Sequence, residues 1–201
     1  MSTPSTTPDV KRSGEITASV VRTLEEYMEA MALRALIFMA DQHCPYSEEF
    51  DGNDLTANHV LLKVDGEPAA TCRIRWFADF AKIERSCIHP DHRSVKLLRA
   101  LLNEAFEYCR RKGYRKVISY TQAHRARQWR AFGFRLRDHR PPFCFSDYEY
   151  VEFEADLQPH PDALTSEAPA WLLNRPEGAW DQPGVLERSA DRGGRRNRPG
   201  A

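Results

Sequence analysis

The sequence has no excess of charge of either sign and no long hydrophobic run. Lys plus Arg and Asp plus Glu each total 29 of the 201 residues, which leaves a formal net charge of zero. A chain that binds nucleic acid along its length normally carries a basic excess, so no nucleic-acid partner is expected. No apolar stretch approaches the roughly 20 residues that span a bilayer, and residues 1–14 lack the apolar segment of an export signal.

Paired cysteines are also absent. The five cysteines form no C-x-x-C motif, and Cys72, Cys87 and Cys109 lie within apolar patterns. Thiols in such patterns behave as small core residues, so we expect reduced cysteines in a cytoplasmic protein, with no disulfide and no metal site. The signatures G-x-S-x-G, H-E-x-x-H and the Walker loop do not occur, which argues against hydrolase, zinc-protease and NTPase chemistry.

Composition divides the chain into three parts. Hydrophobic patterning begins near Ile16 and ends near Leu157. The segment before it is rich in Ser, Thr and Pro, and the segment after it in Pro, Gly and Arg, so neither can build a core alone. We therefore predict a flexible leader over residues 1–15, one folded domain over 16–157 and a mostly disordered tail over 158–201.

The tail has one feature that is unusual for a disordered segment. Trp171 and Trp180 would each cost roughly 1.5–3 kcal/mol if left in water. Residues 171–187 are therefore a candidate docking motif, either for this domain or for a protein partner. A homodimer is also compatible with the sequence, and the final RGGRRNRPGA is predicted to be a solvated basic tip.

The order of predicted helices and strands is that of an α/β domain. Helical spacing of apolar residues predicts the helices, and short apolar runs between turn signals predict the strands. The Asp65-Gly66 dipeptide predicts a hairpin, and Gly113 ends the long helix. The expected helices cover 24–40, 95–111 and a short segment up to 130, and the expected strands cover 59–64, 69–77, 82–88, 117–120 and 148–153. This order predicts a mixed α/β sandwich.

Three local motifs indicate a family. The first is an Arg, a hydrophobic run and a C-P-Y…D-G-N-D-L…H stretch over residues 34–59, and the second is IERSCIHPDHR at 83–93. The third runs from Q-A-H at 122–124 through Trp129 to F-G-F at 132–134. In this order the motifs resemble the GNAT superfamily of N-acetyltransferases, and most of all its ElaA-like branch. The resemblance implies a single α/β domain with a mixed, mostly antiparallel central sheet flanked by helices.

The resemblance also implies an activity and a site for its donor. Members of the family bind acetyl-CoA and transfer its acetyl group to a primary amine, here of a small molecule or a protein. A splayed strand offers backbone groups to the pantetheine arm, and a helix N-terminus with its preceding loop faces the diphosphate. The residues that match these positions are Ile88, Arg93, Ser94, Val95, Lys96, Leu97, Leu98, Gln122 and Trp129.

The phosphate loop departs from the family pattern. The usual loop reads R-x-x-G-x-G/A; here Arg93 is kept, while Lys96 and Leu98 replace the two small residues. A side chain forced into a glycine conformation would cost on the order of 1–3 kcal/mol, although Arg93 and Lys96 offer charge to a phosphate. The alternative is that Leu98 joins the core face of the helix and the loop has lost its ligand.

The groups for proton transfer depart from the pattern as well. Trp129 stands where many members have a tyrosine that protonates the leaving thiolate, and an indole cannot act as an acid at useful pH. Tyr120 is a candidate substitute. Glu84, in the strand before the loop, is the candidate base for the attacking amine. His59 and His124 are alternative bases, since an unperturbed imidazole has a pKa of about 6.5.

Two roles stay open for the acidic residues. Strand alternation predicts one face with Lys82, Glu84 and Ser86 and an opposite face with Ile83, Arg85 and Cys87. An ion pair of Glu84 with Arg73 or Arg75 across the sheet is the alternative to its role as base. The acids at 48–54 either line the acceptor side, where they would favour a cationic amine, or form a solvated loop.

Two further functions are compatible with the sequence. A GNAT-fold protein that binds a partner or an acyl-CoA without turnover would account for the missing glycines, for Trp129 and for the Trp-bearing tail. A transferase of longer acyl chains, similar to the acyl-homoserine-lactone synthases, would share the general fold.

Overall fold

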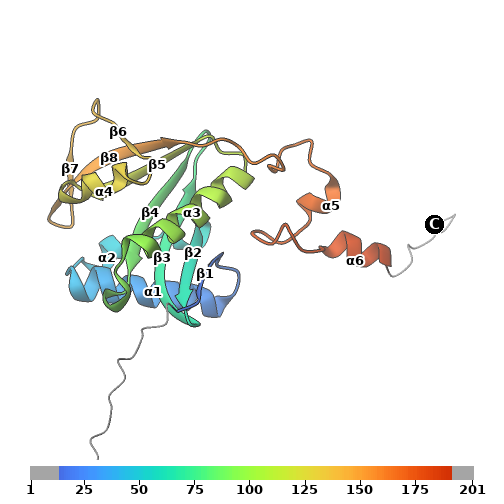
Figure 1. Ribbon diagram of the computed structural model, residues 1–201, viewed down its shortest axis with the longest axis horizontal. Helices are drawn as coiled ribbons and strands as arrows, with labels where there is room; N and C mark the ends of the chain where they lie inside the picture. The colour runs from blue at the N-terminus through green and yellow to red at the C-terminus, as the bar shows by residue number, and fades with distance from the viewer. Residues whose placement is uncertain (1–13, 192–201) are drawn as a thin grey trace, which may run out of the picture.

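The structure, a computed structural model, describes residues 14–191. Most of the leader predicted over 1–15 and the basic tip at 192–201 lie outside these residues. The described chain forms one sheet with helices on both faces, followed by a tail that carries two short helices (Figure 1). No helix in this part of the chain is both long and apolar enough to cross a membrane.

The predicted helices and long strands are confirmed, and three short strands (β1, β6 and β7) are added to them. The strands are β1 (Ile16–Val20), β2 (Asn58–Val64), β3 (Glu67–Trp76), β4 (Ala81–Ile88), β5 (Lys116–Gln122), β6 (Arg135–Leu136), β7 (Phe143–Phe145) and β8 (Tyr148–Asp156). The α-helices are α1 (Leu24–Arg34), α2 (Tyr46–Glu49), α3 (Val95–Arg111), α4 (Ala126–Arg130), α5 (Ala170–Leu173) and α6 (Val185–Asp191). A π-helical segment, η1 (Ala35–Asp41), continues α1, and short 3₁₀ turns are η2 (Asp54–Thr56), η3 (Pro90–His92) and η4 (Ala123–Arg125).

The sheet is mixed and mostly antiparallel, as the resemblance implies. Its strand order is β1-β2-β3-β4-β5-β8-β6, and β7 pairs with β8. In the described part of the chain β4 and β5 are parallel, while the other neighbouring strands are antiparallel. A parallel pair needs a crossover connection, and α3 supplies it. The crossover places the start of α3 close to the carboxyl-terminal end of β4.

Each face of the sheet has its own core. Helices α3 and α4 cover one face, where Ile74, Leu101 and Phe153 are completely buried. Helix α1 covers the other face with a smaller apolar cluster that includes Leu33 and Ile37 (Figure 1). The second cluster is small because ionised side chains occupy much of that face.

Helix α3 begins and ends where the sequence predicts. Ser94 is its N-cap, and its Oγ accepts a hydrogen bond from the backbone N–H of Leu97 at 3.2 Å. Gly113, with φ +83°, lies just beyond the last turn. The N-terminus of α3 therefore lies a few residues after the end of β4, and the first backbone N–H groups of the helix have no partner within it.

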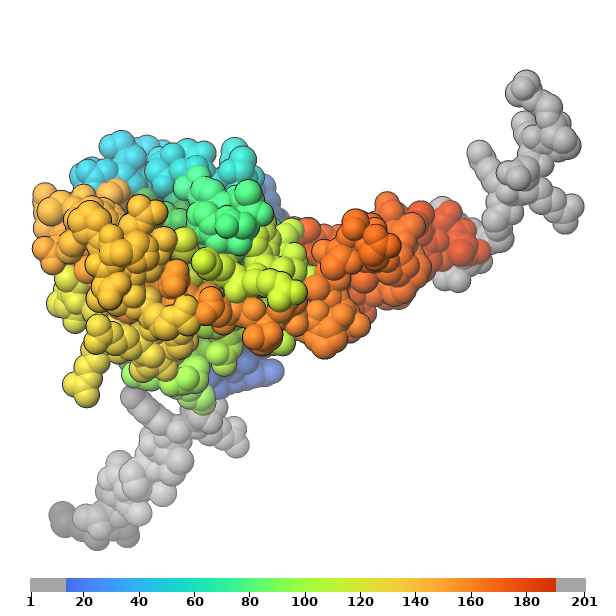
Figure 2. Space-filling model, turned by 90° about the horizontal axis from the view of Figure 1, so that it is seen from above, coloured from blue at the N-terminus to red at the C-terminus, as the bar shows by residue number. Residues whose placement is uncertain are grey.

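Part of the tail packs against its own domain. Trp180 is 6% exposed, and its indole stacks on the ring of Tyr108 in α3 with 5.2 Å between ring centroids. Glu177 accepts hydrogen bonds from the Tyr108 hydroxyl and, at 2.7 Å, from the Lys112 ammonium. Trp171 stays 43% exposed on α5, in a tail that Figure 2 shows projecting from the rest of the molecule. Self-docking is thus present at Trp180, and docking of Trp171 to a partner stays a prediction.

We expect Trp180→Ala to lower the free energy of unfolding by about 3–5 kcal/mol, because it empties a buried, stacked site. The matched control Trp171→Ala removes an exposed ring and should change that free energy by less than about 1 kcal/mol. Denaturant titration followed by circular dichroism measures both. Equal effects of the two substitutions would contradict the docking of Trp180.

Candidate active site

The two parallel strands separate part-way along their length. Strands β4 and β5 pair at three positions, the last being Ile83 with Ser119. Beyond this pair β4 continues to Ile88 and β5 to Gln122, but the two strands no longer pair with each other. Backbone N–H and C=O groups on the facing edges therefore do not bond to each other and are open to a ligand.

A β-bulge turns the end of β4 away from β5. The register between β3 and β4 shifts between Thr71 and Arg73, and Arg85 adopts a left-handed φ of +54°. Bulges bend a strand and increase its twist. The bulge also makes the predicted alternation wrong: Cys87 packs in the α1-side cluster, on the same face as Glu84, which bonds to Arg73.

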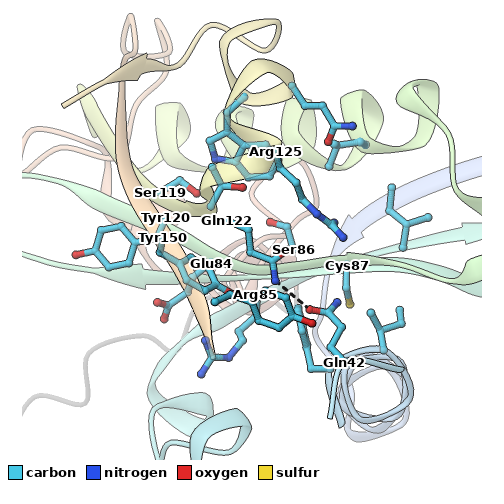
Figure 3. A pocket seen from close by; sticks show the side chains of 18 of the residues that line it. Gln42, Glu84, Arg85, Ser86, Cys87, Ser119, Tyr120, Gln122, Arg125 and Tyr150 are labelled. Atoms are coloured by element: carbon cyan, nitrogen blue, oxygen red, sulfur yellow. Dashed lines mark hydrogen bonds between the residues drawn. The ribbon is translucent and has the colours of Figure 1, made fainter. Parts of the chain in front are cut away.

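A cavity of about 580 Å³ runs through this fork (Figure 3). We define its helix half by lining residues from the end of β4, from α3 and the loop before it, and from η4, α4 and the turn after it: Ile88, Arg93, Ser94, Val95, Leu98, Arg125, Gln128, Trp129 and Phe132. We define its hairpin half by lining residues from β3, β4, β5 and the β7–β8 hairpin: Arg75, Lys82, Glu84, Tyr120, Phe143, Phe145, Tyr148 and Tyr150. The two halves meet where β4 and β5 separate.

Most of the residues predicted to bind the donor line this cavity. They are Ile88, Arg93, Ser94, Val95, Leu98, Gln122 and Trp129, whereas Lys96 and Leu97 are not part of the lining. No residue from 93 to 98 has a positive φ, so the strain predicted for side chains at Lys96 and Leu98 does not arise. Leu98 packs partly against the core, as the alternative predicts, and still lines the cavity.

Three buried polar atoms at the fork have no hydrogen-bond partner among the described residues. They are Oγ of Ser86, Oγ of Ser119 and Nε1 of Trp129, and all three residues line the cavity. An unsatisfied buried polar group costs about 1–3 kcal/mol. These atoms therefore fit a ligand that carries polar groups along its length, such as the amide-containing pantetheine arm of coenzyme A.

Gln122 reaches across the cavity from the end of β5. Its Nε2 donates a hydrogen bond to Oε1 of Gln42, which follows η1, at 3.4 Å (Figure 3). A bond of this length is weak, so a ligand amide can replace it at small cost. Gln122 is 6% exposed and lies in the lining of the cavity.

Glu84 is an ionised and ion-paired group. Nη2 of Arg73 donates to its Oε1 at 2.7 Å, and Nζ of Lys82 lies 2.6 Å from its Oε2. Burial acts to raise the pKa of Glu84, but Lys82 and Arg73 outweigh burial and hold this pKa below its usual range. The predicted ion pair with Arg73 is therefore present. Glu84 nevertheless lines the cavity as a carboxylate, so its role as base stays a prediction.

Tyr120 lies beside Glu84 in the hairpin half. The ammonium of Lys82 is 4.1 Å from the centre of its ring. Burial, followed by the charges of Glu152 and Glu84, raises the pKa of the Tyr120 phenol. The phenol is therefore protonated at neutral pH and can donate a hydrogen bond or a proton.

Neither histidine named as an alternative base lines this cavity. His59 is buried in the ionic face of the sheet, where its Nε2 lies 3.2 Å from the carbonyl oxygen of Asp54. Burial lowers the pKa of His59, so its ring is neutral at pH 7. His124 is exposed on η4.

A network of ion pairs fills the sheet face near α1. Arg34 and Arg73 are completely buried, and both donate to the carboxylate of Asp54. Nε of Arg34 also donates to Glu49 at 2.5 Å, and Nη2 of Arg73 donates to Asp51 at 2.7 Å. Three of the four acids at 48–54, namely Glu49, Asp51 and Asp54, are therefore paired with arginines, and they form neither a solvated loop nor a bare anionic surface.

The aromatic wall of the hairpin half was not identified from the sequence. It consists of Phe143, Phe145, Tyr148 and Tyr150. Aromatic residues at every second position of β7 and of the start of β8 were an available signal. Arg75 and Arg125 also line the cavity without having been predicted.

Comparison with known proteins identifies the family. The sequence model of the acetyltransferase (GNAT) family matches residues 20–134, more than half of the chain. The chain belongs to the GNAT family. Enzymes of this family generally use acetyl-CoA as co-substrate, and the fork of β4 and β5 is the part of the GNAT domain that the cavity occupies.

Individual relatives are distant. The uncharacterised protein YyaT of Bacillus subtilis is 26% identical over 119 residues, which are 58% of this chain and 80% of YyaT. An acyl-CoA N-acyltransferase from Pseudomonas aeruginosa has a similar structure, with a TM-score of 0.64 and 22% identity over 70% of this chain and 99% of that chain. Escherichia coli ElaA is similar with a TM-score of 0.62 and 23% identity, over 69% of this chain and 99% of that chain. The two structures show that the GNAT fold is shared, and they confirm the resemblance to ElaA.

We expect Asp54→Asn to lower the free energy of unfolding at pH 7 by about 3–5 kcal/mol, because Arg34 and Arg73 lose a shared carboxylate. Burial acts to raise the pKa of Asp54, but the two arginines hold it below its usual value. The stabilisation is thus complete above the unfolded-state pKa of about 3.9 and is lost as pH falls below it.

Denaturant titrations between pH 7 and pH 3 measure this effect. The stability difference between the wild type and Asp54→Asn should shrink toward acid pH. Asp138→Asn is the matched control, since that side chain is 91% exposed and should leave stability nearly unchanged. A difference that is independent of pH would contradict the ion-pair explanation.

Proposed function

We propose that this GNAT-family protein is an N-acetyltransferase that transfers the acetyl group of acetyl-CoA to a primary amine of a small molecule or a protein. The observation that carries the proposal is the fork of β4 and β5. Pairing of the two strands ends at Ile83 and Ser119, and the cavity begins there. A thioester in the helix half and an amine in the hairpin half would meet at this fork. A domain that had lost its ligand would be expected to fill this space with side chains.

The helix half supports binding of the donor along its length. At the fork, where the helix half begins, the unpaired hydroxyls of Ser86 and Ser119 suit the amides of the pantetheine arm. The N-terminus of α3, capped by Ser94, favours the negatively charged diphosphate. Arg93 and Arg125 add two cations to the same half. In this arrangement the charges of Arg93 and Arg125 hold the phosphates, in place of the close contact between backbone and phosphate that the missing glycines would allow.

Glu84 is the proposed base for the amine. A carboxylate with a lowered pKa is a weak base, and taking a proton from an ammonium group with a pKa of about 10.4 is uphill by more than about 8 kcal/mol. We infer that Glu84 accepts the proton as the nitrogen bonds to the acetyl carbon, because that N–H then becomes acidic. Arg73 and Lys82 keep Glu84 ionised and oriented for this step.

Tyr120 is the proposed acid for the leaving group. As the new C–N bond forms, the C–S bond breaks and the departing thiolate takes up a proton. The raised pKa of Tyr120 keeps its proton available at neutral pH. Trp129 cannot supply this proton, and its proposed role is to contact the pantetheine arm.

We expect Glu84→Gln to lower kcat about 100-fold or more, because the variant keeps the shape of the side chain but cannot accept the proton. Release of free thiol from acetyl-CoA over a panel of amines measures this. Glu107→Gln, on the α3 surface beside Arg110, is the matched control and should retain kcat. Full activity of a folded Glu84→Gln variant would remove Glu84 as base.

We expect Arg125→Gln to weaken binding of acetyl-CoA about tenfold and to leave binding of S-acetylpantetheine, which lacks the phosphates, unchanged. Calorimetric titration with both compounds measures this. Arg127→Gln, on α4 but outside the cavity lining, is the control. Acetyl-CoA should also raise the melting temperature by mass action. Absence of any shift at millimolar acetyl-CoA would contradict the proposed function.

A further inference from the structure

The carboxylates of the cavity are already ion-paired. Among the described residues that line it, the carboxylates are those of Glu49, Asp51 and Glu84. Each lies within 2.9 Å of an arginine or lysine nitrogen. A carboxylate that is satisfied by a buried cation has little attraction left for a cationic ligand. The cavity therefore does not select its acceptor through these acids, although the sequence allowed that expectation.

One cation of the hairpin half lacks such a partner. The guanidinium of Arg75 lies 3.9 Å from the carboxylate of Glu84. Among the described residues no other carboxylate lies within 4.0 Å of this guanidinium. The side chain of Arg75 is 29% exposed. The guanidinium carbon of Arg75 also lies 5.2 Å from the centre of the Phe77 ring. Glu84 is thus surrounded by Arg73, Arg75 and Lys82. Arg73 also binds Asp51 and Asp54, and without Arg75 the buried network around Glu84 holds equal numbers of carboxylates and cations. Arg75 therefore adds one net positive charge to this part of the cavity.

The rest of the hairpin half is lined by aromatic side chains. The ring of Phe143 lies 5.1 Å from that of Tyr120 and 5.8 Å from that of Tyr150. The ring of Phe145 lies 5.9 Å from that of Tyr150. Tyr120 and Tyr150 are labelled with Glu84 among the residues that line the cavity in Figure 3. Such a row of rings favours a flat or apolar group of a ligand.

From this arrangement we propose that the acceptor is an amine that carries a carboxylate on the neighbouring carbon and an apolar side group, the pattern of an apolar α-amino acid. The inference rests on the proposed function and specifies its acceptor. The amine lies at Glu84, the carboxylate pairs with Arg75, and the side group contacts the aromatic wall. The 3.9 Å between Glu84 and Arg75 suits a ligand whose opposite charges are that close together. A plain alkylamine or a polyamine would leave Arg75 without a partner.

The test measures binding apart from turnover. The full-length protein, with and without saturating CoA, is titrated calorimetrically with the N-acetylated forms of phenylalanine, tryptophan and methionine. Each is compared with its decarboxylated counterpart, so that the members of a pair differ only in the carboxylate. We expect the carboxylate member to bind at least tenfold more tightly at low salt. Arg75→Gln should abolish this preference, and Arg99→Gln, which lies on α3 outside the lining, should retain it.

Several results would overturn the inference: equal binding within each pair, tighter binding of the decarboxylated member, or a preference that survives Arg75→Gln. Thiol release from acetyl-CoA with the free amines is measured separately. Turnover of carboxylate-free amines alone would contradict the inference and leave the proposed function standing. Carboxylate-selective binding without turnover of any amine would support the class of ligand assigned to the cavity and contradict the proposed function.

Discussion

The opening between β4 and β5 depends on the ion pair that holds Arg85. A left-handed φ of +54° at a residue other than glycine costs about 1–3 kcal/mol. The guanidinium of Arg85 lies 2.9 Å from Glu49 and donates to the carbonyl oxygen of Glu48 at 2.6 Å, contacts that stabilise this conformation. Glu49 is itself fixed by Arg34 of α1. The bend at the cavity is therefore connected to the buried charges beneath α1.

These buried charges are balanced within one continuous network. Its carboxylates and cations are Glu49, Asp51, Asp54, Glu84, Arg34, Arg73, Arg85 and Lys82. A buried ion network is costly to desolvate and is tolerated only when each member has partners. Apolar side chains in place of these ion pairs can stabilise the fold as well. They would neither hold Arg85 in the bulge nor keep Glu84 ionised. The network therefore connects the stability of the α1 face with the chemistry of the cavity.

The sequence predicts the parts of this structure that depend on local pattern. Helix α3 was predicted with its observed bounds, because the spacing of its apolar residues and Gly113 are local signals. The bulge was missed because a single extra residue shifts the register, which moved Cys87 to the face of Glu84. The pair of Glu84 with Arg73 was predicted as an alternative, because the two residues lie on neighbouring strands. The other partners in the ion network were not predicted, since they come from separate elements that only the fold brings together. Comparison with the glycine pattern predicted strain in the phosphate loop, whereas the capped helix accommodates those side chains with ordinary backbone angles.

The charge of the cavity also bears on how a weakly basic Glu84 could act on the proposed acceptor. Before binding, Arg73 and Lys82 outweigh the burial of Glu84 and keep its pKa low. A carboxylate that pairs with Arg75 would offset one of the positive charges near Glu84, which lies 3.9 Å from that guanidinium. The bound side group would exclude water from the same part of the cavity. Both changes raise the pKa of a carboxylate, so Glu84 becomes a stronger base when an acceptor of the proposed class is bound. Selection of the acceptor and activation of its amine would then rest on the same group of charges.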